Sequence, residues 1–244
     1  EIVQELPTVD YILAPVGGGG LITGVSTLAK MLNPKIKVIG VEPAAAPSMT
    51  MALASGEPVT LDSANTIADG TAVKRVGDRI FEYAKKNIDQ MLTVEDDELV
   101  GAFLDMVENH KMIVENSGLL TVAALKQLDL KGKKAVAILS GGNMDVITMS
   151  SIVQHGLIQR DRIFSASVLL PDKPGQLALV AQTIADAQGN VIKLEHNQFV
   201  STNRNAAVEL RITMEAYGTE HKNQIMKALE EKGFRPREIG AKLY

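Results

Sequence analysis

The first part of the chain alternates between short, almost wholly apolar runs and longer runs with helical spacing. The apolar runs are VDYILAP (9–15), IKVIGVE (36–42), DQMLTV (89–94) and KAVAILS (134–140). The helical runs cover about 21–32, 46–54, 76–86, 95–110 and 118–128, and another helix follows residue 144. Strands that are apolar on both faces and separated by helices are typical of a parallel sheet covered on both sides. We therefore predict an α/β domain over residues 1–157.

The pattern changes after residue 157. RIFSASVLLPDKPGQL (162–177) predicts a strand that ends in a Pro/Gly turn. A helix to about 188, strands at 191–199 and 206–216, a helix at 219–232 and a strand at 234–239 follow. The order βαββαβ predicts a ferredoxin-like sandwich, a fold that by itself indicates no function. We expect the domain boundary at 157–162 and the second domain over 162–244.

The overall composition narrows the choice of partners and compartment. The chain has 244 residues, 25 Lys and Arg against 29 Asp and Glu, a net charge of −4 and no cysteine. Without a basic stripe, nucleic acid is not an expected partner. The lack of cysteine excludes disulfides and thiolate metal sites and favours the cytoplasm, and no apolar run reaches the ~18 residues of a membrane span. The chain begins at Glu1 in what reads as the end of a helix, so we expect it to be a fragment.

APVGGGGLITGV (14–25) places four consecutive glycines between a predicted strand and a predicted helix. Bare N–H groups at a helix N-terminus favour an anion. No Gly-Lys-Ser/Thr follows, and the pattern GxGxxG fails at Thr23. We predict that this loop binds a single phosphate group; the alternative is a tight strand-to-helix turn without a ligand.

A second glycine turn, AILSGGNMDV (137–146), follows the last apolar run of the first domain. The carboxyl ends of parallel strands meet at one edge of the sheet, so we expect both glycine loops to face one cleft. Ser140 presents a hydroxyl group there, and Asn143 could brace the turn. The alternative is that Ser140 only caps the next helix.

Five motifs then resemble one enzyme family. In order, PVGGGGLITG, VEPAAAPSM, TIADGTAVKRVG, ENSGLLTVAAL and LSGGNMD resemble the C-terminal half of the fold type II pyridoxal phosphate enzymes, most closely the threonine dehydratases (threonine ammonia-lyases). Serine racemase and serine dehydratase are near relatives. The resemblance covers residues 1 to about 157. It implies that Gly17, Gly18, Gly19, Gly20 and the Leu21 amide hold the cofactor phosphate, and that Ser140 hydrogen-bonds the pyridine nitrogen.

The resemblance implies deamination of L-threonine, and of L-serine as well, to a 2-oxo acid and ammonia, as in isoleucine biosynthesis. A neutral hydroxyl beside the ring nitrogen makes the ring a weaker electron sink than a carboxylate would, which favours elimination over transamination. Racemisation and β-replacement are alternatives on the same fold. A third reading, for these residues alone, is a catalytically inert amino-acid-sensing dimerisation module.

The sequence departs from this family in two respects. The family's Schiff-base lysine lies in a Ser-x-Lys-x-Arg-Gly motif that nothing here matches, and Lys30 and Lys74 read as surface residues. We therefore expect these residues alone not to turn over threonine. The family also implies a cation site at Glu42, the Ala46 carbonyl and Ser48, where serine replaces an acidic ligand, so a monovalent ion or an empty site is expected as much as Mg²⁺.

Glu115 and the second domain complete the expected sites. Glu115 either lies under the cofactor ring or is a structural carboxylate at a helix start.

LPDKPGQL (170–177) resembles the first loop of a regulatory ACT domain. That resemblance implies an amino-acid effector, a paired arrangement of ACT domains in a homodimer or tetramer, and the effector-binding residues Asp172, Gly175, Gln176, Leu177 and Asn190. The alternative is a purely structural turn. The sequence does not name the effector, although isoleucine or valine is the family expectation.

Overall fold

The computed structural model of the chain describes residues 1–197 and 208–241. It divides into two compact units, Glu1–Val153 and Gln154–Tyr244. The division falls a few residues before the boundary expected from the sequence pattern. Each unit has a sheet of its own, and they are described separately.

The first unit is built on a four-stranded parallel sheet, as the apolar runs predict. Its strands are β1 (Tyr11–Pro15), β2 (Lys37–Pro43), β3 (Gln90–Val94) and β4 (Ala135–Ala137). They lie in the order β3-β2-β1-β4, and all three pairings are parallel. β4 is shorter than the predicted 134–140: the paired residues end at Ala137, the Ile138 N–H still donates to Leu13 O, and Leu139 and Ser140 form a loop.

The helices of the first unit begin and end close to the predicted positions. They are α1 (Ile2–Glu5), α2 (Gly20–Leu32), α3 (Ser48–Ser55), α4 (Asp78–Asn87), α5 (Asp96–Asp105) and α6 (Asn116–Ala124), and α7 (Val146–Gln159) begins in this unit and ends in the second. Short helical turns follow α5 at Met106–His110 and α6 at Leu125–Gln127, and a 3-10 turn, η1, covers Asp69–Thr71. No helix in the described part of the chain is long and apolar enough to cross a membrane.

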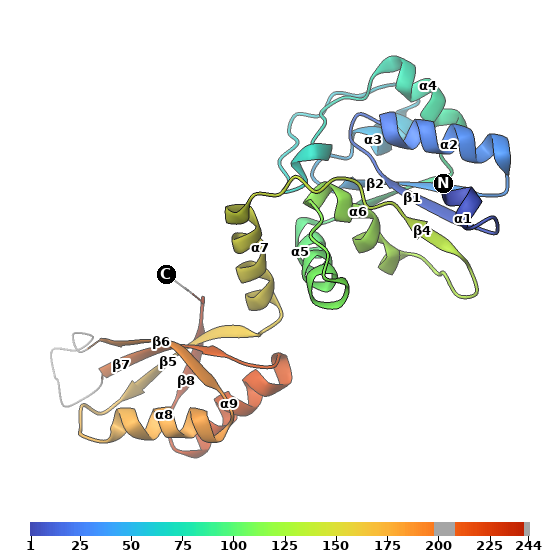
Figure 1. The fold of residues 1–244 in the computed structure, drawn as a ribbon. Coiled ribbons are helices and arrows are strands. Elements are labelled where there is room, and N and C mark those ends of the chain that lie inside the picture. Colours follow the sequence, from blue (N-terminus) through green and yellow to red (C-terminus); the bar gives the residue numbers. More distant parts are fainter. Residues whose placement is uncertain (198–207, 242–244) are drawn as a thin grey trace. The chain divides into compact units, whose positions relative to one another are not determined.

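Both faces of the central strands β1 and β2 are buried, which explains why most of their residues are apolar. Ile12 and Ala14 of β1 pack in one core with residues of α2, α3 and α4, while Leu13 packs in a second core with α5 and α6. Figure 1 shows α2, α3 and α4 on one side of the strands and α5 and α6 on the other. The edge at which the strands end therefore stays open to a ligand.

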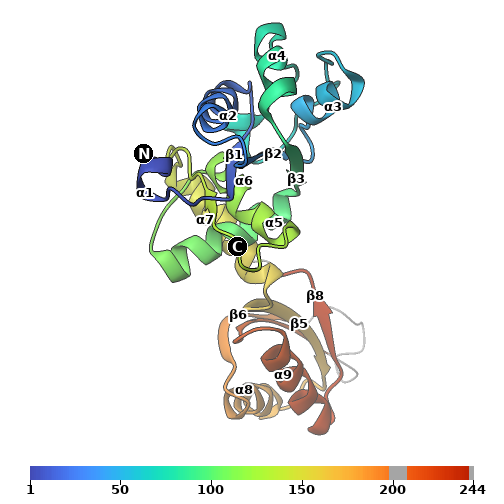
Figure 2. The same cartoon turned by 90° about the vertical axis from the view of Figure 1, so that its right-hand side faces the viewer.

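The second unit has the element order βαββαβ that the sequence predicts. Its elements are β5 (Ile163–Leu170), α8 (Gln176–Asp186), β6 (Asn190–Asn197), β7 (Val208–Glu215), α9 (Thr219–Glu231) and β8 (Pro236–Ile239). The antiparallel sheet has the order β6-β7-β5-β8, and α8 and α9 cover one of its faces (Figure 2). Residues 198–199 and 206–207 of the two predicted middle strands lie outside the described residues.

Candidate functional site

The N-terminus of α2 lacks the carboxylate that other helices of this unit have. Gly19 is its N-cap residue, no side chain caps it among the described residues, and its first turn contains no acidic residue. In contrast, Glu42 accepts hydrogen bonds from the first turn of α3, Glu95 caps α5, and Asp145 accepts from the first turn of α7. The free N–H groups and the helix dipole of α2 therefore favour an anion from outside the chain.

The four glycines divide into two that pack against protein and two that face open space. A Cβ atom on Gly19, whose φ is +85°, would lie 2.6 Å from Ile80 Cγ2 and 2.8 Å from Met49 Cε. A Cβ atom on Gly18 or Gly20 would have no other atom within 4 Å. Gly19 is therefore required by the turn and its packing. The bare backbone at Gly18 and Gly20 instead leaves room beside the helix N-terminus.

That room is a pocket of about 200 Å³ at the carboxyl ends of β1 and β4. One wall is the loop after β1, with Pro15, Gly17 to Gly20 and Leu21; the rest is formed by Gly70, Thr71, Glu115, Ser117 and Ser140. The structure thus brings together all six residues that the sequence predicts to hold a cofactor, from two loops more than 110 positions apart. In the sheet, β1 lies between β2 and β4, and the pocket lies at the carboxyl end of β1. Ligands of parallel sheets commonly bind at such a position.

Glu115 holds the second loop in place. It is the N-cap residue of α6, and its Oε2 accepts a hydrogen bond of 3.1 Å from the backbone N–H of Asn143. Gly141 has φ +87°, and a Cβ atom there would lie 2.2 Å from Glu115 Oε1. Asn143 thus braces the turn through its backbone, and Glu115 both lines the pocket and supports the loop that carries Ser140.

Gly70, Thr71 and Ser117 line the pocket as well, although no pattern in the sequence predicts a role for them. Gly70 and Thr71 belong to η1, and Thr71 Oγ1 donates a hydrogen bond of 2.9 Å to Ala68 O and lies 3.5 Å from Ser117 Oγ. The motifs TIADGTAV and ENSG contain these residues, but nothing local in either motif indicates that they meet beside the glycine loop.

At the predicted cation site, the carboxylate of Glu42 is already engaged. Oε1 accepts from Met49 N at 2.7 Å and lies 3.5 Å from Ser48 Oγ, while Oε2 accepts from Thr50 N at 2.8 Å and Thr50 Oγ1 at 2.7 Å. Burial raises the pKa of this carboxyl, against the lowering effect of those hydrogen bonds. Among residues 1–197 and 208–241, no group of three or more His, Asp or Glu side chains could hold a metal ion. A cation at Glu42, Ala46 and Ser48 stays a prediction.

Two lysines considered in the sequence analysis make contacts away from the pocket. Lys30 Nζ donates to Ile36 O and pairs with Asp89, and Lys74 Nζ donates to Asp62 O. No lysine from the described residues lines the pocket.

In the second unit, the predicted effector residues lie at the start of α8 and of β6. Gly175, with φ +90°, is the N-cap residue of α8, and Gln176 is its first residue. Leu177 is 38% exposed, and Asp172 belongs to the loop before the helix. Asn190 starts β6 and donates a hydrogen bond of 2.7 Å from Nδ2 to Glu215 Oε2. A role in binding an effector stays a prediction for all five.

The first unit is therefore an α/β protein with a glycine-lined pocket at the carboxyl edge of a parallel sheet, a position that suits a phosphate-bearing group. The model of one family, the pyridoxal-phosphate dependent enzymes, matches residues 1–141, and the chain belongs to this family. Its relatives include an L-threonine ammonia-lyase of Thermotoga maritima, 37% identical over 241 residues, or 98% of this chain and 60% of that protein. Another, from Geobacter sulfurreducens, is 38% identical over 96% of this chain and 59% of its own length. The chain therefore spans about 60% of the length of these relatives.

Solved structures support the same fold. The processed form of threonine deaminase isoform 2 from Solanum lycopersicum is 36% identical and superposes with a TM-score of 0.59, covering 63% of this chain and 46% of that one. Serine racemase from Dictyostelium discoideum is 38% identical with a TM-score of 0.55, covering 59% of this chain and 47% of that one.

The residues present fit the family's cofactor, pyridoxal phosphate. The uncapped N-terminus of α2 and the open backbone at Gly18 and Gly20 suit its phosphate group, and the Ser140 hydroxyl in the same pocket suits its ring nitrogen. A neutral hydroxyl is compatible with an unprotonated pyridine.

Proposed function

We propose that the chain is the cofactor-holding and regulatory part of an L-threonine ammonia-lyase, which forms 2-oxobutanoate and ammonia and also acts on L-serine. The observation that carries the proposal is the shared pocket of the glycine loop and Ser140 in a chain that is 37% identical to a relative of that name. Because the chain spans about 60% of that relative, the activity is proposed for the complete gene product. A cytoplasmic location belongs to the same proposal.

The glycine loop, Glu115 and Ser140 each have a stated part in this proposal. The N–H groups of Gly17 to Leu21 bind the phosphate, and the loop held by Glu115 positions the Ser140 hydroxyl at the ring nitrogen. When bound, pyridoxal phosphate supplies the electron sink that acidifies the substrate's α-hydrogen. Ser140 cannot keep the ring nitrogen protonated as a carboxylate would, so the site suits loss of the β-hydroxyl rather than a long-lived carbanion. Since nothing in this sequence matches the family's Schiff-base lysine motif, we expect these residues alone not to turn over threonine.

The second unit is, in this proposal, an ACT domain that binds an amino-acid effector. Its βαββαβ order and the left-handed Gly175 at the start of α8 support this assignment. The effector contacts the backbone around Asp172, Gly175, Gln176 and Leu177, with Asn190 from a neighbouring subunit in a homodimer or tetramer. Asn190 then exchanges its present bond to Glu215 for the effector.

The test is an assay of the complete gene product with L-threonine, L-serine and pyridoxal phosphate. We expect 2-oxobutanoate and pyruvate, measured with a keto-acid reagent, and a fall in turnover for Ser140→Asp, which would protonate the ring nitrogen. Cofactor binding without keto-acid formation would refute the lyase assignment. Racemisation is the second candidate because serine racemase from Dictyostelium discoideum is 38% identical; D-serine as the main product would favour it.

A further inference from the structure

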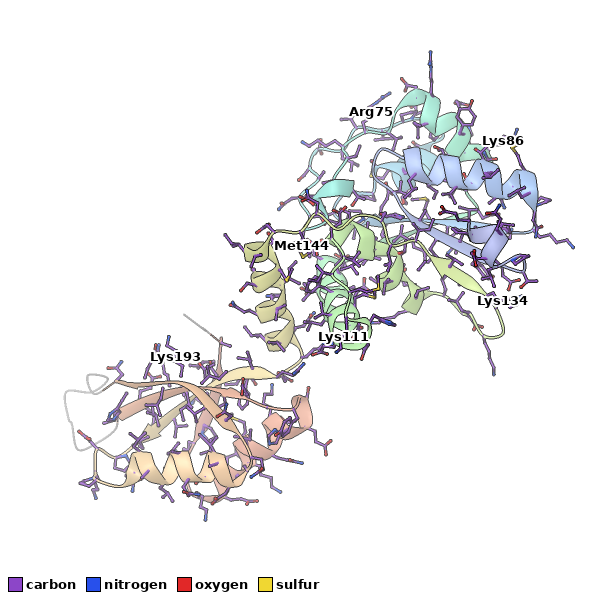
Figure 3. The ribbon with its side chains drawn as sticks, viewed as in Figure 1. Arg75, Lys86, Lys111, Lys134, Met144 and Lys193 are labelled. Atoms are coloured by element: carbon purple, nitrogen blue, oxygen red, sulfur yellow. The ribbon has the colours of Figure 1, made fainter. Side chains whose placement is uncertain are left out.

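The long loop 56–77, which joins α3 to α4, forms one wall of the cofactor pocket. Its only regular element among the described residues is the turn η1, which supplies Gly70 and Thr71 to the pocket. The loop ends just before α4, where Figure 3 labels Arg75. Long loops with little secondary structure of their own are uncommon in compact domains and are usually functional. The contacts that hold this loop therefore bear on the pocket.

The backbone of Ile67 is held by side chains from the starts of two helices. The Ile67 N–H donates a hydrogen bond of 3.1 Å to Oδ2 of Asp96, the first residue of α5. The Ile67 carbonyl accepts a hydrogen bond of 2.9 Å from Nδ2 of Asn116, the first residue of α6. Thr66 Oγ1 also donates to Asp96, through Oδ1. The loop is thus fixed to the N-termini of α5 and α6 immediately before η1.

The turn η1 passes this position on to the glycine loop. The carbonyl of Ala68, which is fully buried, accepts hydrogen bonds from Thr71 N at 3.0 Å and Thr71 Oγ1 at 2.9 Å. A Cβ atom on Gly17 would lie 3.0 Å from Thr71 Cα and 3.2 Å from Gly70 O. Because the two backbones are this close, a shift at Ile67 changes the distance between η1 and Gly17.

Stability alone does not explain the asparagine at position 116. Asn116 is 5% exposed, and its Oδ1 has no hydrogen-bond partner within the described residues. A buried acceptor without a partner lowers stability, so an apolar side chain of similar size would suit this position better. A residue that breaks such a rule is commonly one that serves function.

We propose that Asn116 and Asp96 are positioning residues, which act through Ile67 to hold η1 at the distance from the glycine loop that pyridoxal phosphate needs. Neither side chain lines the pocket, so their effect passes through the backbone. The start of α6 then supports two sides of the pocket, because Glu115 holds the Ser140 loop and Asn116 holds η1. This inference rests on the cofactor binding proposed above.

The first test compares two variants of the 244-residue chain. Asn116→Leu removes the donor to Ile67 and the unpaired Oδ1 but nearly keeps the size of the side chain. Gln127→Leu is the matched control, because Gln127 Nε2 donates a hydrogen bond of 2.8 Å to Thr93 O beyond the other end of α6. Equilibrium dialysis should show affinity for pyridoxal phosphate roughly fivefold or more weaker in Asn116→Leu, the effect of one neutral hydrogen bond, and unchanged in Gln127→Leu.

Two further measurements separate positioning from a general loss of structure. Without cofactor, the urea midpoint of Asn116→Leu should be no lower than that of the natural chain, while the Thr71 amide should exchange its hydrogen faster. Asp96→Ala should weaken binding as well. The double variant should bind within about twofold of the weaker single variant, because both side chains act through Ile67.

The possible outcomes distinguish this inference from the proposed function. A natural chain that does not bind pyridoxal phosphate would refute the proposed function, and this inference with it. Binding by the natural chain with equal affinity in Asn116→Leu would refute the positioning role alone. An affinity that falls together with the urea midpoint, or that falls equally in Gln127→Leu, would show a merely structural role and would also overturn the inference.

Discussion

Alanine substitutions at Gly19 and Gly20 should have opposite effects on the stability of the first unit. An alanine at Gly19 must adopt a φ of +85° and place its methyl group 2.6 Å from Ile80 Cγ2. The left-handed conformation costs an L-residue about 1–2 kcal/mol, and overpacking a core costs about 1–3 kcal/mol. We expect Gly19→Ala to lower the free energy of unfolding by about 2–5 kcal/mol, a large part of the ~5–15 kcal/mol of a typical domain.

Gly20→Ala is the matched comparison. Gly20 is the first residue of α2, and its new methyl group would meet no atom within 4 Å. Alanine restricts the unfolded chain, so we expect stability to rise by about 0.4–1 kcal/mol. The methyl group would nevertheless enter the space beside the helix N-terminus. Losing one charge-assisted hydrogen bond to phosphate costs about 1.5–3 kcal/mol, so affinity for pyridoxal phosphate should fall roughly 10- to 100-fold.

Urea unfolding followed by circular dichroism measures the free energy of unfolding, and equilibrium dialysis with pyridoxal phosphate measures the cofactor affinity. We expect stability and binding to change independently: Gly19→Ala lowers the free energy of unfolding, and Gly20→Ala lowers the cofactor affinity without lowering stability. Unchanged cofactor affinity in a folded Gly20→Ala protein would refute the role of the glycine loop. Unchanged stability of Gly19→Ala would refute the packing that we assign to it.

Three further predictions concern carboxylates. Gly141→Ala and Glu115→Ala should couple by at least about 1 kcal/mol in a double-mutant cycle of urea unfolding, because the new methyl group of Gly141→Ala would collide with Glu115 Oε1. Additive effects would contradict this contact. Burial raises the pKa of Glu42 above its ordinary 4.5, so its contribution to stability is present below that value and is lost as pH rises through the raised one. We expect the free energy of unfolding, measured at several pH values, to decline in this way for the natural chain and not for Glu42→Gln. An equal dependence on pH in the two proteins would refute this prediction. Lys222 Nζ lies 2.8 Å from Asp161 Oδ1, and its hydrogen bond lowers the pKa of Asp161 below the ordinary 3.8. This interaction therefore contributes to stability above that pH, and the contribution is lost as pH falls through the lowered pKa. Lys222→Gln should therefore destabilise the second unit by about 1–2 kcal/mol near pH 7 and by less near pH 3, whereas Lys227→Gln should change nothing measurable.

Local patterns were sufficient for most of the fold. The continuous apolar runs predicted a parallel sheet because only strands buried on both faces have no polar side, and both faces of β1 are indeed packed. The clearest difference is β4, where the apolar run continues to Ser140 but the ladder ends at Ala137. Ile138 and Leu139, beyond the strand, are partly buried against the two cores, so packing rather than pairing accounts for the apolar residues there.

The sequence by itself determined the order of the elements, the position of the glycine loop between β1 and α2, and the expectation that Ser140 shares its cleft. These follow from neighbours in the chain and from the common direction of parallel strands. Only the tertiary structure decided that Glu115 supports the Gly141 turn, that Thr71 and Ser117 line the pocket, and that the carboxylate of Glu42 is engaged by α3. It also decided which charged side chains align across the second sheet. Such contacts depend on register and on approaches of a few ångströms between distant segments, and no local pattern in the chain encodes those distances.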